Sequence, residues 1–382
     1  MLNRLKLRNF KSARDLEIPL AGLTVLAGLN GSGKSTVLQV VALLRQSLLS
    51  SHSTKLRRLH LRGPLVQLGS VTDVLSDRAA ENNISILVDV DGRTSSWAAD
   101  AISESDILNV TEDSVDPDSA LTNASAGTFQ FLQADRLAPK THYDISDAIN
   151  RDLGFLGIHG EFTPGYLADQ GERLEVSSTR RCPLDDAALD SDLTTRIVAT
   201  PRLYDQVNGW LQFLSPGVRL RSDQLSDTDL VSLRFSYAST EIAQDSRDRR
   251  PSNVGFGLTY SLPIIVALLS APPGALLLLE NPEAHLHPRG QVALGSLIAR
   301  CAADGVQVIV ETHSDHLLNG IRLAVRRKHI SSSSVRLCNF TRDPTTGDTY
   351  IETPAVLDSG ELTAWPSGFF DEWEKSLENL LK

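Results

Sequence analysis

The sequence predicts an α/β fold built around a parallel sheet. Strand and helix patterns alternate through the C-terminal half, which is typical of parallel strands joined by crossover helices. Near the N-terminus, an apolar strand at 23–27 leads into a glycine-rich loop and then a helical pattern at 35–49. Hydrophobic residues make up 41% of the 382 residues and charged residues 22%, a balance typical of globular proteins.

The N-terminal elements follow from period-2 patterns. Residues 2–10 alternate apolar and charged side chains and predict a half-buried strand, and 16–20 predict a second, shorter strand. Residues 84–90 predict another strand, which ends at an Asp-Gly turn. Between about 100 and 200 the chain is polar and acidic with little periodicity, so we expect a loop-rich insertion, interrupted by a strand at 128–135.

Regular patterns return after residue 200. They predict helices and strands in the order 203–214 (helix), 218–220 and 231–236 (strands), 255–269 (helix), 276–279 (strand), 290–303 (helix), 306–310 (strand) and 314–325 (helix). The tail predicts two strands around a turn at 343–347 and a last helix from residue 369. We therefore divide the chain into an N-terminal α/β half at 1–99, an insertion at 100–200, a C-terminal α/β half at 201–330 and a tail at 331–382.

Charge and cysteine content narrow the class of protein. Lys and Arg number 37 against 47 Asp and Glu, and the net charge of −10 gives no support to a general nucleic-acid-coating or membrane-surface role. The three cysteines, Cys182, Cys301 and Cys338, exclude a disulfide framework and suit a reducing compartment. The N-terminus has no apolar leader, and the apolar stretch 258–279 is interrupted by prolines. We expect a cytoplasmic protein without a membrane span.

A phosphate-binding loop is the strongest motif in the sequence. Gly28-Leu-Asn-Gly-Ser-Gly-Lys-Ser35 fits G-x-x-x-x-G-K-[ST], with a strand before it and a helix after it. Its backbone N–H groups and the helix dipole favour a phosphate, Lys34 should reach the β- and γ-phosphates, and Ser35 should ligate Mg²⁺. A glycine-rich turn that binds nothing would not need Lys followed by Ser. The sequence therefore predicts ATP and Mg²⁺ as ligands, with nucleotide contacts from Gly28, Asn30, Gly31, Ser32, Gly33, Lys34, Ser35 and Thr36.

Polar residues follow the two later apolar strands. Glu280 ends the strand at 276–279, and Glu311 and His313 follow the strand at 306–310. Because the carboxyl ends of parallel strands open on the ligand crevice, Glu280 could hold Mg²⁺ opposite Ser35, and His313 could donate to a γ-phosphate oxygen. The alternatives are a buried strand that ends in a solvated acid, and a surface or helix-capping histidine.

These motifs together resemble an ATPase of the ABC-type head class, in the lineage of RecF, SMC and OLD nucleases. The resemblance rests on Leu7-Arg-Asn-Phe-Lys-Ser12, the phosphate loop, Glu280-Asn-Pro-Glu-Ala-His-Leu-His-Pro288 and Glu311-Thr-His-Ser314. More narrowly, the chain is similar to small bacterial AAA-family ATPases that have a C-terminal domain of unknown function. Residues 365–371 resemble the tail of that family. The resemblance implies an ABC-type head, of mixed and parallel sheet with flanking helices, a loop-rich insertion and a small α+β tail.

The resemblance also implies that two heads form a homodimer around two ATPs. The phosphate loop of one head would face a signature segment of the other, for which Ser252, Asn253, Gly255 and Gly257 are the candidates. Glycines at a helix start expose N–H groups to a γ-phosphate, which fits this role. The alternative is an ordinary helix start with Ser252 or Asn253 as N-cap.

Two residues depart from the class. Glu280 stands where Asp usually holds the metal, and Asn281 stands where the catalytic Glu is usual. A neutral amide can position a water but cannot accept its proton, so hydrolysis should be slow or use another base. Glu311 is our candidate for that base, and Glu283 is the alternative.

Three functions are compatible with these motifs. The resemblance favours an ATP-dependent switch that controls a protein effector, in settings such as anti-phage defence. A RecF-like DNA-binding ATPase is the second, with two basic clusters that could equally be solvated helix faces. The third is the ATP-binding subunit of a transporter, which the unusual signature and the insertion disfavour. The basic clusters are Lys55, Arg57, Arg58, His60 and Arg62, and Arg322, Arg326, Arg327 and Lys328.

Overall fold

The computed structural model describes residues 1–51, 56–101, 104–114, 121, 125, 127–146, 148–183, 200–237, 246–365, 377 and 379–381. Three features of the sequence lie outside these residues. They are Lys55, the residues 366–371 of the segment that resembles the family tail, and the start of the helix expected from 369. The chain forms two compact units. The first consists of Met1–Ala124, Ile309–His313 and Ser331–Lys382, and the second of Ser125–Val308 and Ser314–Ile330.

An antiparallel sheet forms one layer of the first unit. Its six strands run in the order β2-β1-β5-β6-β7-β4. Along β5, buried and half-buried residues alternate, as the period-2 pattern predicts for a strand with one face on a core. The strands are β1 (Leu2–Phe10), β2 (Ala13–Pro19), β4 (Arg58–His60), β5 (Asn83–Val90), β6 (Arg93–Asp100) and β7 (Ile107–Ser114).

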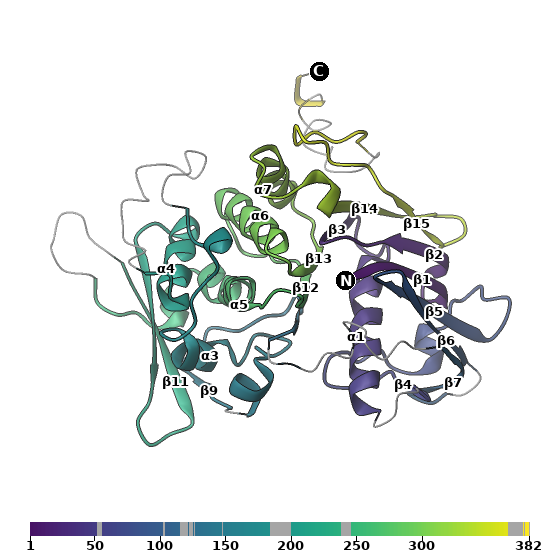
Figure 1. The fold of residues 1–382 in the computed structure, drawn as a ribbon, viewed down its shortest axis with the longest axis horizontal. Coiled ribbons are helices and arrows are strands. Elements are labelled where there is room, and N and C mark those ends of the chain that lie inside the picture. The colour runs from purple at the N-terminus through teal and green to yellow at the C-terminus, as the bar shows by residue number, and fades with distance from the viewer. Residues whose placement is uncertain are drawn as a thin grey trace. The chain divides into compact units, whose positions relative to one another are not determined.

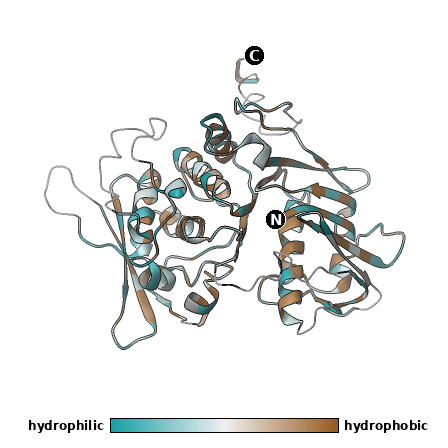
Figure 2. Ribbon diagram, viewed as in Figure 1, coloured by the Kyte–Doolittle hydropathy of each residue, from teal (hydrophilic) through white to brown (hydrophobic). Residues whose placement is uncertain are grey.

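Helix α1 (Lys34–Ser50) packs beside this sheet (Figure 1). Its apolar residues are buried almost continuously from Val37 to Leu44, and Figure 2 shows the helix largely in hydrophobic colours. Gln46 and Ser47 near its end hydrogen-bond the backbone of His60 in β4. The short helix α2 (Val71–Val74) follows β4 and begins with a capping box from Ser70 and Asp73. The phosphate-loop helix is thus fixed by apolar packing and by its polar end.

The first unit also contains part of a parallel sheet. Strand β14 (Val335–Arg342) pairs in parallel with β3 (Leu23–Gly28) along its length, from Val335 opposite Leu23 to Phe340 opposite Gly28. Strand β15 (Thr349–Glu352) pairs antiparallel with the other edge of β14 (Figure 1). The two tail strands that the sequence predicts are present, and the first of them lies directly beside the strand that leads into the phosphate loop.

The second unit contains the other parallel pair. Strand β12 (Leu276–Glu280) pairs in parallel with β8 (Phe129–Leu132), and Gln307, at the start of β13 (Gln307–Glu311), donates its N–H to the carbonyl of Ala275. The parallel pairs and the flanking helices confirm the α/β class. The helices are α3 (Thr163–Gln170), α4 (Leu203–Leu214), α5 (Phe256–Ser270), α6 (Pro288–Ala303) and α7 (Asp315–Arg326).

A small antiparallel sheet completes the second unit. Its strand order is β10 (Val218–Gln224), β11 (Leu230–Tyr237) and β9 (His142–Asp144). The stretch from 100 to 200 therefore holds more regular structure than its weak periodicity indicates, because the short elements β7, β9 and α3 lie in it together with the π-helical turn Ala148–Leu153. Short elements with few apolar positions give little periodic signal, and packing against the rest of the chain determines them.

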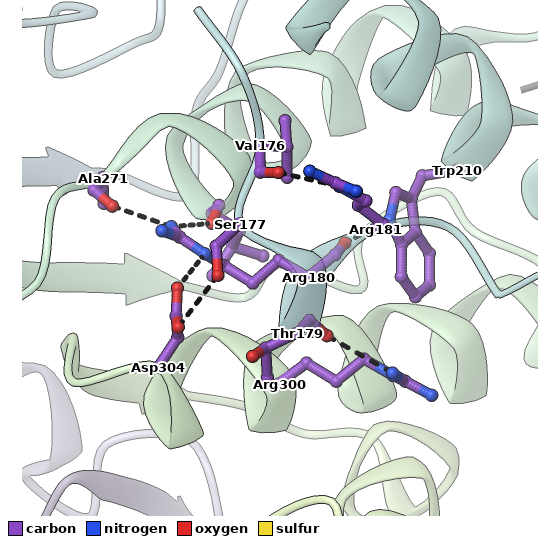
Figure 3. A network of polar contacts seen from close by, with 10 residues as sticks. Val176, Ser177, Thr179, Arg180, Arg181, Trp210, Ala271, Arg300 and Asp304 are labelled. Atoms are coloured by element: carbon purple, nitrogen blue, oxygen red, sulfur yellow. Dashed lines mark hydrogen bonds and ion pairs between the residues drawn. The ribbon is translucent and has the colours of Figure 1, made fainter. Parts of the chain in front are cut away.

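A buried arginine connects three helices of the second unit (Figure 3). Arg180, in the 3₁₀ turn Ser178–Arg180, donates to the carbonyls of Leu268 and Ala271 at the end of α5. Its Nε lies 2.8 Å from a carboxylate oxygen of Asp304, which follows α6. Trp210 of α4 donates its indole N–H to the carbonyl of Arg180. A cation near helix C-termini is electrostatically favourable, and here it fixes the positions of α4, α5 and α6.

The apolar stretch at 258–279 divides as the sequence predicts. It forms α5, a turn and β12, and α5 is buried along nearly its whole length. Among the described helices, none has both the length and the apolar character that crossing a membrane requires. All three cysteines are free and buried, and burial raises the pKa of each thiol to about 12.

Candidate nucleotide site

The phosphate loop connects β3 to α1 in the first unit. Gly28 has φ of 131°, and a Cβ there would lie 2.2 Å from the carbonyl oxygen of Phe340 in β14, so this position requires glycine. Gly33 is the N-cap of α1 with φ of 99°. Leu29 and Asn30 are exposed, whereas Ser32 and Lys34 are only 2% and 3% exposed. The loop thus curves around its own lysine.

Lys34 holds the loop closed through its ammonium group. Its Nζ donates to the carbonyls of Gly28 (3.0 Å) and Leu29 (2.7 Å), and it lies 3.9 Å from Oε1 of Glu311. Burial lowers the pKa of Lys34, and the neighbouring Glu311 carboxylate opposes that shift. The ammonium is therefore oriented by the loop and faces a carboxylate.

Ser35 and Glu311 form the most direct contact of the site. The hydroxyl of Ser35 donates to Oε1 of Glu311 over 3.0 Å. Glu311 is the last residue of β13 and is 5% exposed. The next residue, Thr312, donates its N–H to the carbonyl of Leu26 in β3. The strand end therefore places the carboxylate at the first turn of α1, which agrees with the expectation that residues after this strand reach the phosphate loop.

His313 lies two residues further, in the same unit, with an exposed side chain. Partial burial is the main cause that lowers its pKa, and the nearby charge of Lys34 lowers it further. Since its pKa lies below the ordinary value of 6.5, the imidazole is mostly neutral at pH 7. A neutral imidazole can donate one hydrogen bond, which is compatible with the phosphate contact that the sequence predicts.

The loop has the features that a polyphosphate needs. The N–H groups at the start of an α-helix such as α1 carry the positive end of the helix dipole and favour an anion. The buried hydroxyl oxygen of Ser32 has no hydrogen-bond partner in the described part of the chain. Gly31 has open space around the position of a Cβ. These backbone and hydroxyl donors, together with the lysine, fit ATP, and the hydroxyl of Ser35 beside a carboxylate fits Mg²⁺, which prefers oxygen ligands.

The tail packs directly against the phosphate loop. Thr349 is the first residue of β15. Its hydroxyl lies within hydrogen-bond distance of two acceptors, the carbonyl of Ser32 (2.9 Å) and the hydroxyl of Ser12 (2.8 Å). A Cβ on Gly33 would lie 2.8 Å from the Thr349 hydroxyl and 2.9 Å from that of Ser12. Residues far apart in sequence thus define the shape of the loop, and no local sequence signal indicates the role of Thr349.

The acidic strand end lies in the second unit. The side chain of Glu280 accepts a hydrogen bond from the N–H of Ala134 (3.1 Å). Arg136, 5% exposed, donates to the carbonyls of Glu280, Asn281 and Tyr260 and holds the turn after β12. Glu283 is buried in the same turn. Burial lowers the pKa of Arg136 to about 10, and the nearby Tyr260, Glu283 and Glu280 oppose the shift.

The backbone of this turn is unusual. Asn281 and His285 have φ of 41° and 64°, in the left-handed region that non-glycine residues seldom adopt. His285 packs edge-on against Phe256 and Tyr260 of α5. A Cβ on Gly257 would lie 2.5 Å from the carbonyl oxygen of His285, so the start of α5 and the turn are in direct contact. His287 caps α6, since its ring Nδ1 accepts from the N–H of Arg289 (3.4 Å).

The candidate signature segment begins α5. Pro251–Asn253 form a 3₁₀ turn, and Gly255 is the N-cap of α5 without a side-chain capping bond. Ser252 and Asn253 therefore do not cap this helix, and the capping alternative is wrong, because the turn places both before the N-cap position. Ser252, Asn253 and Gly255 are exposed, and Phe256 is 43% exposed. The helix start is accessible to a partner.

The structure thus brings the predicted residues together in two groups. The first unit holds the phosphate loop, Glu311 and His313, and the second holds Glu280, Glu283 and the segment 252–257. A magnesium ion shared by Ser35 and Glu280 stays a prediction. No motif in the sequence marks Arg136 or Thr349 as parts of the candidate site, because a buried arginine and a strand threonine become informative only through their tertiary contacts.

The chain is similar to known proteins in sequence over a short segment and in fold over most of its length. An OLD nuclease from Thermus scotoductus is 43% identical over 44 residues, which are 12% of this chain and 8% of that protein. The SMC head bound to the C-winged helix domain of ScpA has a TM-score of 0.50 at 13% identity, covering 93% of this chain and 98% of that one. The SMC head domain from Thermotoga maritima has a TM-score of 0.42 at 14% identity, covering 92% and 98%.

At this identity, the similarity to the ScpA-bound SMC head concerns the fold, and it confirms the ABC-type head that the sequence predicts. Residues 330–380 match a family described as "Protein of unknown function (DUF3696)". Residues 23–319, which are most of the chain, match the model of a family of ATPase domains. The chain therefore belongs to the family described as "AAA domain, putative AbiEii toxin, Type IV TA system", and its fold is that of an ABC-type head.

Proposed function

We propose that this protein is a magnesium-dependent ATP switch with slow hydrolysis, in which ATP brings two copies together and so controls a protein effector. The observation that carries the proposal is the phosphate loop, in which Lys34 is buried and oriented by two loop carbonyls while Ser35 contacts a carboxylate. A glycine-rich turn without a ligand has no use for a buried, oriented ammonium, because burying that charge is costly.

Each candidate site residue of the first unit has a definite role in this proposal. The N–H groups at the start of α1 and the ammonium of Lys34 bind the β- and γ-phosphates. The hydroxyl of Ser35 holds the magnesium ion, which when bound neutralises the phosphate charge. His313 donates a hydrogen bond to an oxygen of the γ-phosphate. These are positioning and electrostatic roles, which account for most of catalysis in phosphoryl transfer.

Homodimer formation would complete the site. The start of α5 is exposed, carries glycines at positions 255 and 257, and points the positive end of a 15-residue helix outward. In the proposed dimer, this helix start from each copy covers the γ-phosphate bound by the other, which makes the interface isologous. Association then depends on ATP. Without the γ-phosphate, no anion lies between the positively polarised phosphate loop of one copy and the start of α5 of the other.

Hydrolysis should be slow because the usual base position is occupied by Asn281. Two buried carboxylates, Glu283 and Glu311, are the candidates for the base. Removing a positioned base lowers the rate by about 10²- to 10⁴-fold. Steady-state assays of Glu283→Gln and Glu311→Gln side by side show which one turnover requires, and Asn281→Glu should leave the rate unchanged or raise it.

The test of the proposed function is calorimetric titration with ATP and Mg²⁺, followed by light scattering of the same samples. The wild-type chain should bind ATP and increase in mass, or change its scattering profile if it is already a dimer. Absence of ATP binding would disprove the nucleotide site. Binding without any change in mass or shape would disprove the switch while leaving the site intact.

Direct DNA binding is the second candidate. Arg326, Arg327 and Lys328 are exposed at the end of α7, in the second of the basic clusters. Phosphate contacts by such a cluster give an affinity that falls linearly with the logarithm of salt concentration. A titration of duplex DNA between low and physiological salt tests this, with Arg326→Gln/Arg327→Gln as the variant. Affinity that is the same in the variant would exclude this cluster.

A further inference from the structure

We propose that Glu311 is a direct ligand of the magnesium ion that accompanies ATP, beside Ser35, rather than the base. The inference rests on the proposed ATP site and assigns to this carboxylate a position in the metal's coordination shell. It is carried by the contact between Ser35 Oγ and Glu311 Oε1, by the burial of Glu311 and by its distance from Lys34.

The separation of the two oxygens matches the geometry that magnesium requires. Mg²⁺ binds six oxygens octahedrally at about 2.0–2.1 Å, so two adjacent ligand oxygens lie about 2.8–3.0 Å apart. Ser35 Oγ and Glu311 Oε1 are 3.0 Å apart. In this structure the hydroxyl of Ser35 donates its hydrogen bond to the carboxylate. A cation could bind both oxygens with little movement of either side chain, because their spacing is already that of adjacent ligands.

The charge balance supports the same role. Glu311 is 5% exposed, and the ammonium of Lys34 lies 3.9 Å from its carboxylate. When ATP enters, its phosphates compete for that ammonium and bring several negative charges close to the carboxylate. A buried carboxylate beside a triphosphate is strongly unfavourable unless a cation lies between them. Direct coordination of Mg²⁺ removes this repulsion, whereas an uncoordinated base at this position would retain it.

The backbone fixes the carboxylate at this position. Glu311 ends β13, and the following N–H, that of Thr312, is bonded to Leu26 of β3, the strand that leads into the phosphate loop. The oxygen pair therefore belongs to neighbouring parts of one unit, joined by a backbone hydrogen bond. With Glu311 assigned to the metal, Glu283 is left as the candidate base for hydrolysis.

The test compares ATP binding with and without the metal. Calorimetry measures ATP affinity in Mg²⁺ and in EDTA for the wild type, for Glu311→Gln and for the control Asp15→Asn, which removes an exposed carboxylate of the same unit. We expect Mg²⁺ to raise the affinity of the wild type and of Asp15→Asn. Glu311→Gln should lose about tenfold or more of that gain. In EDTA it should bind ATP as well as the wild type or better, because one repulsive charge is gone.

Mn²⁺ supplies a second readout that does not depend on turnover. Electron paramagnetic resonance measures the fraction of Mn²⁺ bound in the protein–ATP complex. This fraction should fall in Glu311→Gln and be partly restored in Glu311→Asp, which keeps a carboxylate on a shorter side chain.

Each contrary result has a distinct meaning. If Glu311→Gln keeps the full gain from Mg²⁺, Glu311 is not a ligand and the proposal is wrong. If the variant loses affinity equally in Mg²⁺ and in EDTA, the role is structural and the proposal is equally wrong. If the wild type binds no ATP in either condition, the proposed function itself is wrong. The wild-type titration therefore distinguishes a failure of the proposed function from a failure of the Glu311 proposal.

Discussion

The hydroxyl of Thr349 lies 2.9 Å from the carbonyl oxygen of Ser32, so a residue of the C-terminal tail hydrogen-bonds the middle of the phosphate loop. The same hydroxyl lies 2.8 Å from that of Ser12, and both face the Cα of Gly33. The loop is therefore held from outside by β15 and by the turn after β1. This relationship makes the tail part of the nucleotide site, and it leads to the first prediction.

Thr349→Val should weaken ATP binding, because valine keeps the shape of threonine but cannot donate to Ser32. A single neutral hydrogen bond contributes about 0.5–1.5 kcal/mol, so we expect a loss of roughly 2- to 10-fold in affinity if the loop relaxes. Calorimetry with Mg-ATP measures it. Thr349→Ser keeps the hydroxyl and should bind nearly as the wild type does, and equal affinity for all three proteins would contradict a role in the loop.

Lys34→Ala should remove a charge-assisted contact to the phosphates. Such contacts are worth roughly 1.5–3 kcal/mol, so the affinity for ATP should fall about 10-fold or more. The fold should persist, since the loop is also held by Thr349 and by the α1 packing. Titration calorimetry gives the affinity, circular dichroism checks the fold, and unchanged affinity in a folded variant would disprove the nucleotide site.

Gly255→Glu should block ATP-dependent association without affecting ATP binding by a single copy. Gly255 has φ of −57°, which any residue can adopt, and a Cβ there has no atom within 4 Å. A carboxylate at the N-cap also suits the helix dipole, so the fold should be retained. In the proposed dimer, however, it would repel the γ-phosphate bound by the other copy.

Light scattering with a non-hydrolysable ATP analogue measures this effect. Gly255→Ala serves as the control, because it adds a small neutral side chain at the same position. If Gly255→Glu associates as strongly as the wild type, the start of α5 does not face a phosphate.

His313 should titrate below the ordinary pKa of histidine. Partial burial is the main cause, and the charge of Lys34 adds to it, so Lys34→Met should raise the pKa of His313 only in part. Because the unfolded chain takes up this proton first, the stability that His313 contributes is present above pH 6.5 and is lost as the pH falls through its folded pKa. Histidine Cε1–H NMR titration, with the signal assigned by its loss in His313→Gln, tests both statements. If the pKa of His313 is the same in Lys34→Met as in the wild type, there is no electrostatic coupling between Lys34 and His313.

Arg180→Met should destabilise the second unit. It leaves the carbonyls of Leu268 and Ala271 without their donor and Asp304 without its cation (Figure 3). Breaking a buried ion pair from one side costs about 3–5 kcal/mol. Asp304→Asn should cost less, since the amide oxygen can still accept from Ser177. Urea denaturation of both single variants and the double variant should give a coupling of about 0.5–3 kcal/mol, and additive losses would mean that the two residues act independently.

Long periodic segments were predictable because their signal is local. The strand at 2–10, the helix at 203–214 and the strand–turn–helix of the phosphate loop depend on the alternation of side chains and on glycine backbone preferences. Glu311 and His313 could be singled out for a similar reason, since they follow an apolar strand whose carboxyl end predicts a ligand site. The weakly periodic stretch from 100 to 200 gave no such signal. There β9 and α3 form through contacts with strands and helices distant in sequence, and β7 pairs with its neighbour β6 and with the more distant β4.

The sequence by itself determined the α/β class, the phosphate loop and the residue types that can serve ATP, because spacing and backbone preference are properties of neighbouring residues. Tertiary structure alone decided that β14 lies beside β3, that Thr349 supports the loop and that the carboxylate of Glu311 meets the hydroxyl of Ser35. Those contacts join residues separated by more than 270 positions, as Ser35 and Glu311 are by 276. The physical reason is that pairing between distant strands is set by the packing of the whole unit, which no local pattern encodes.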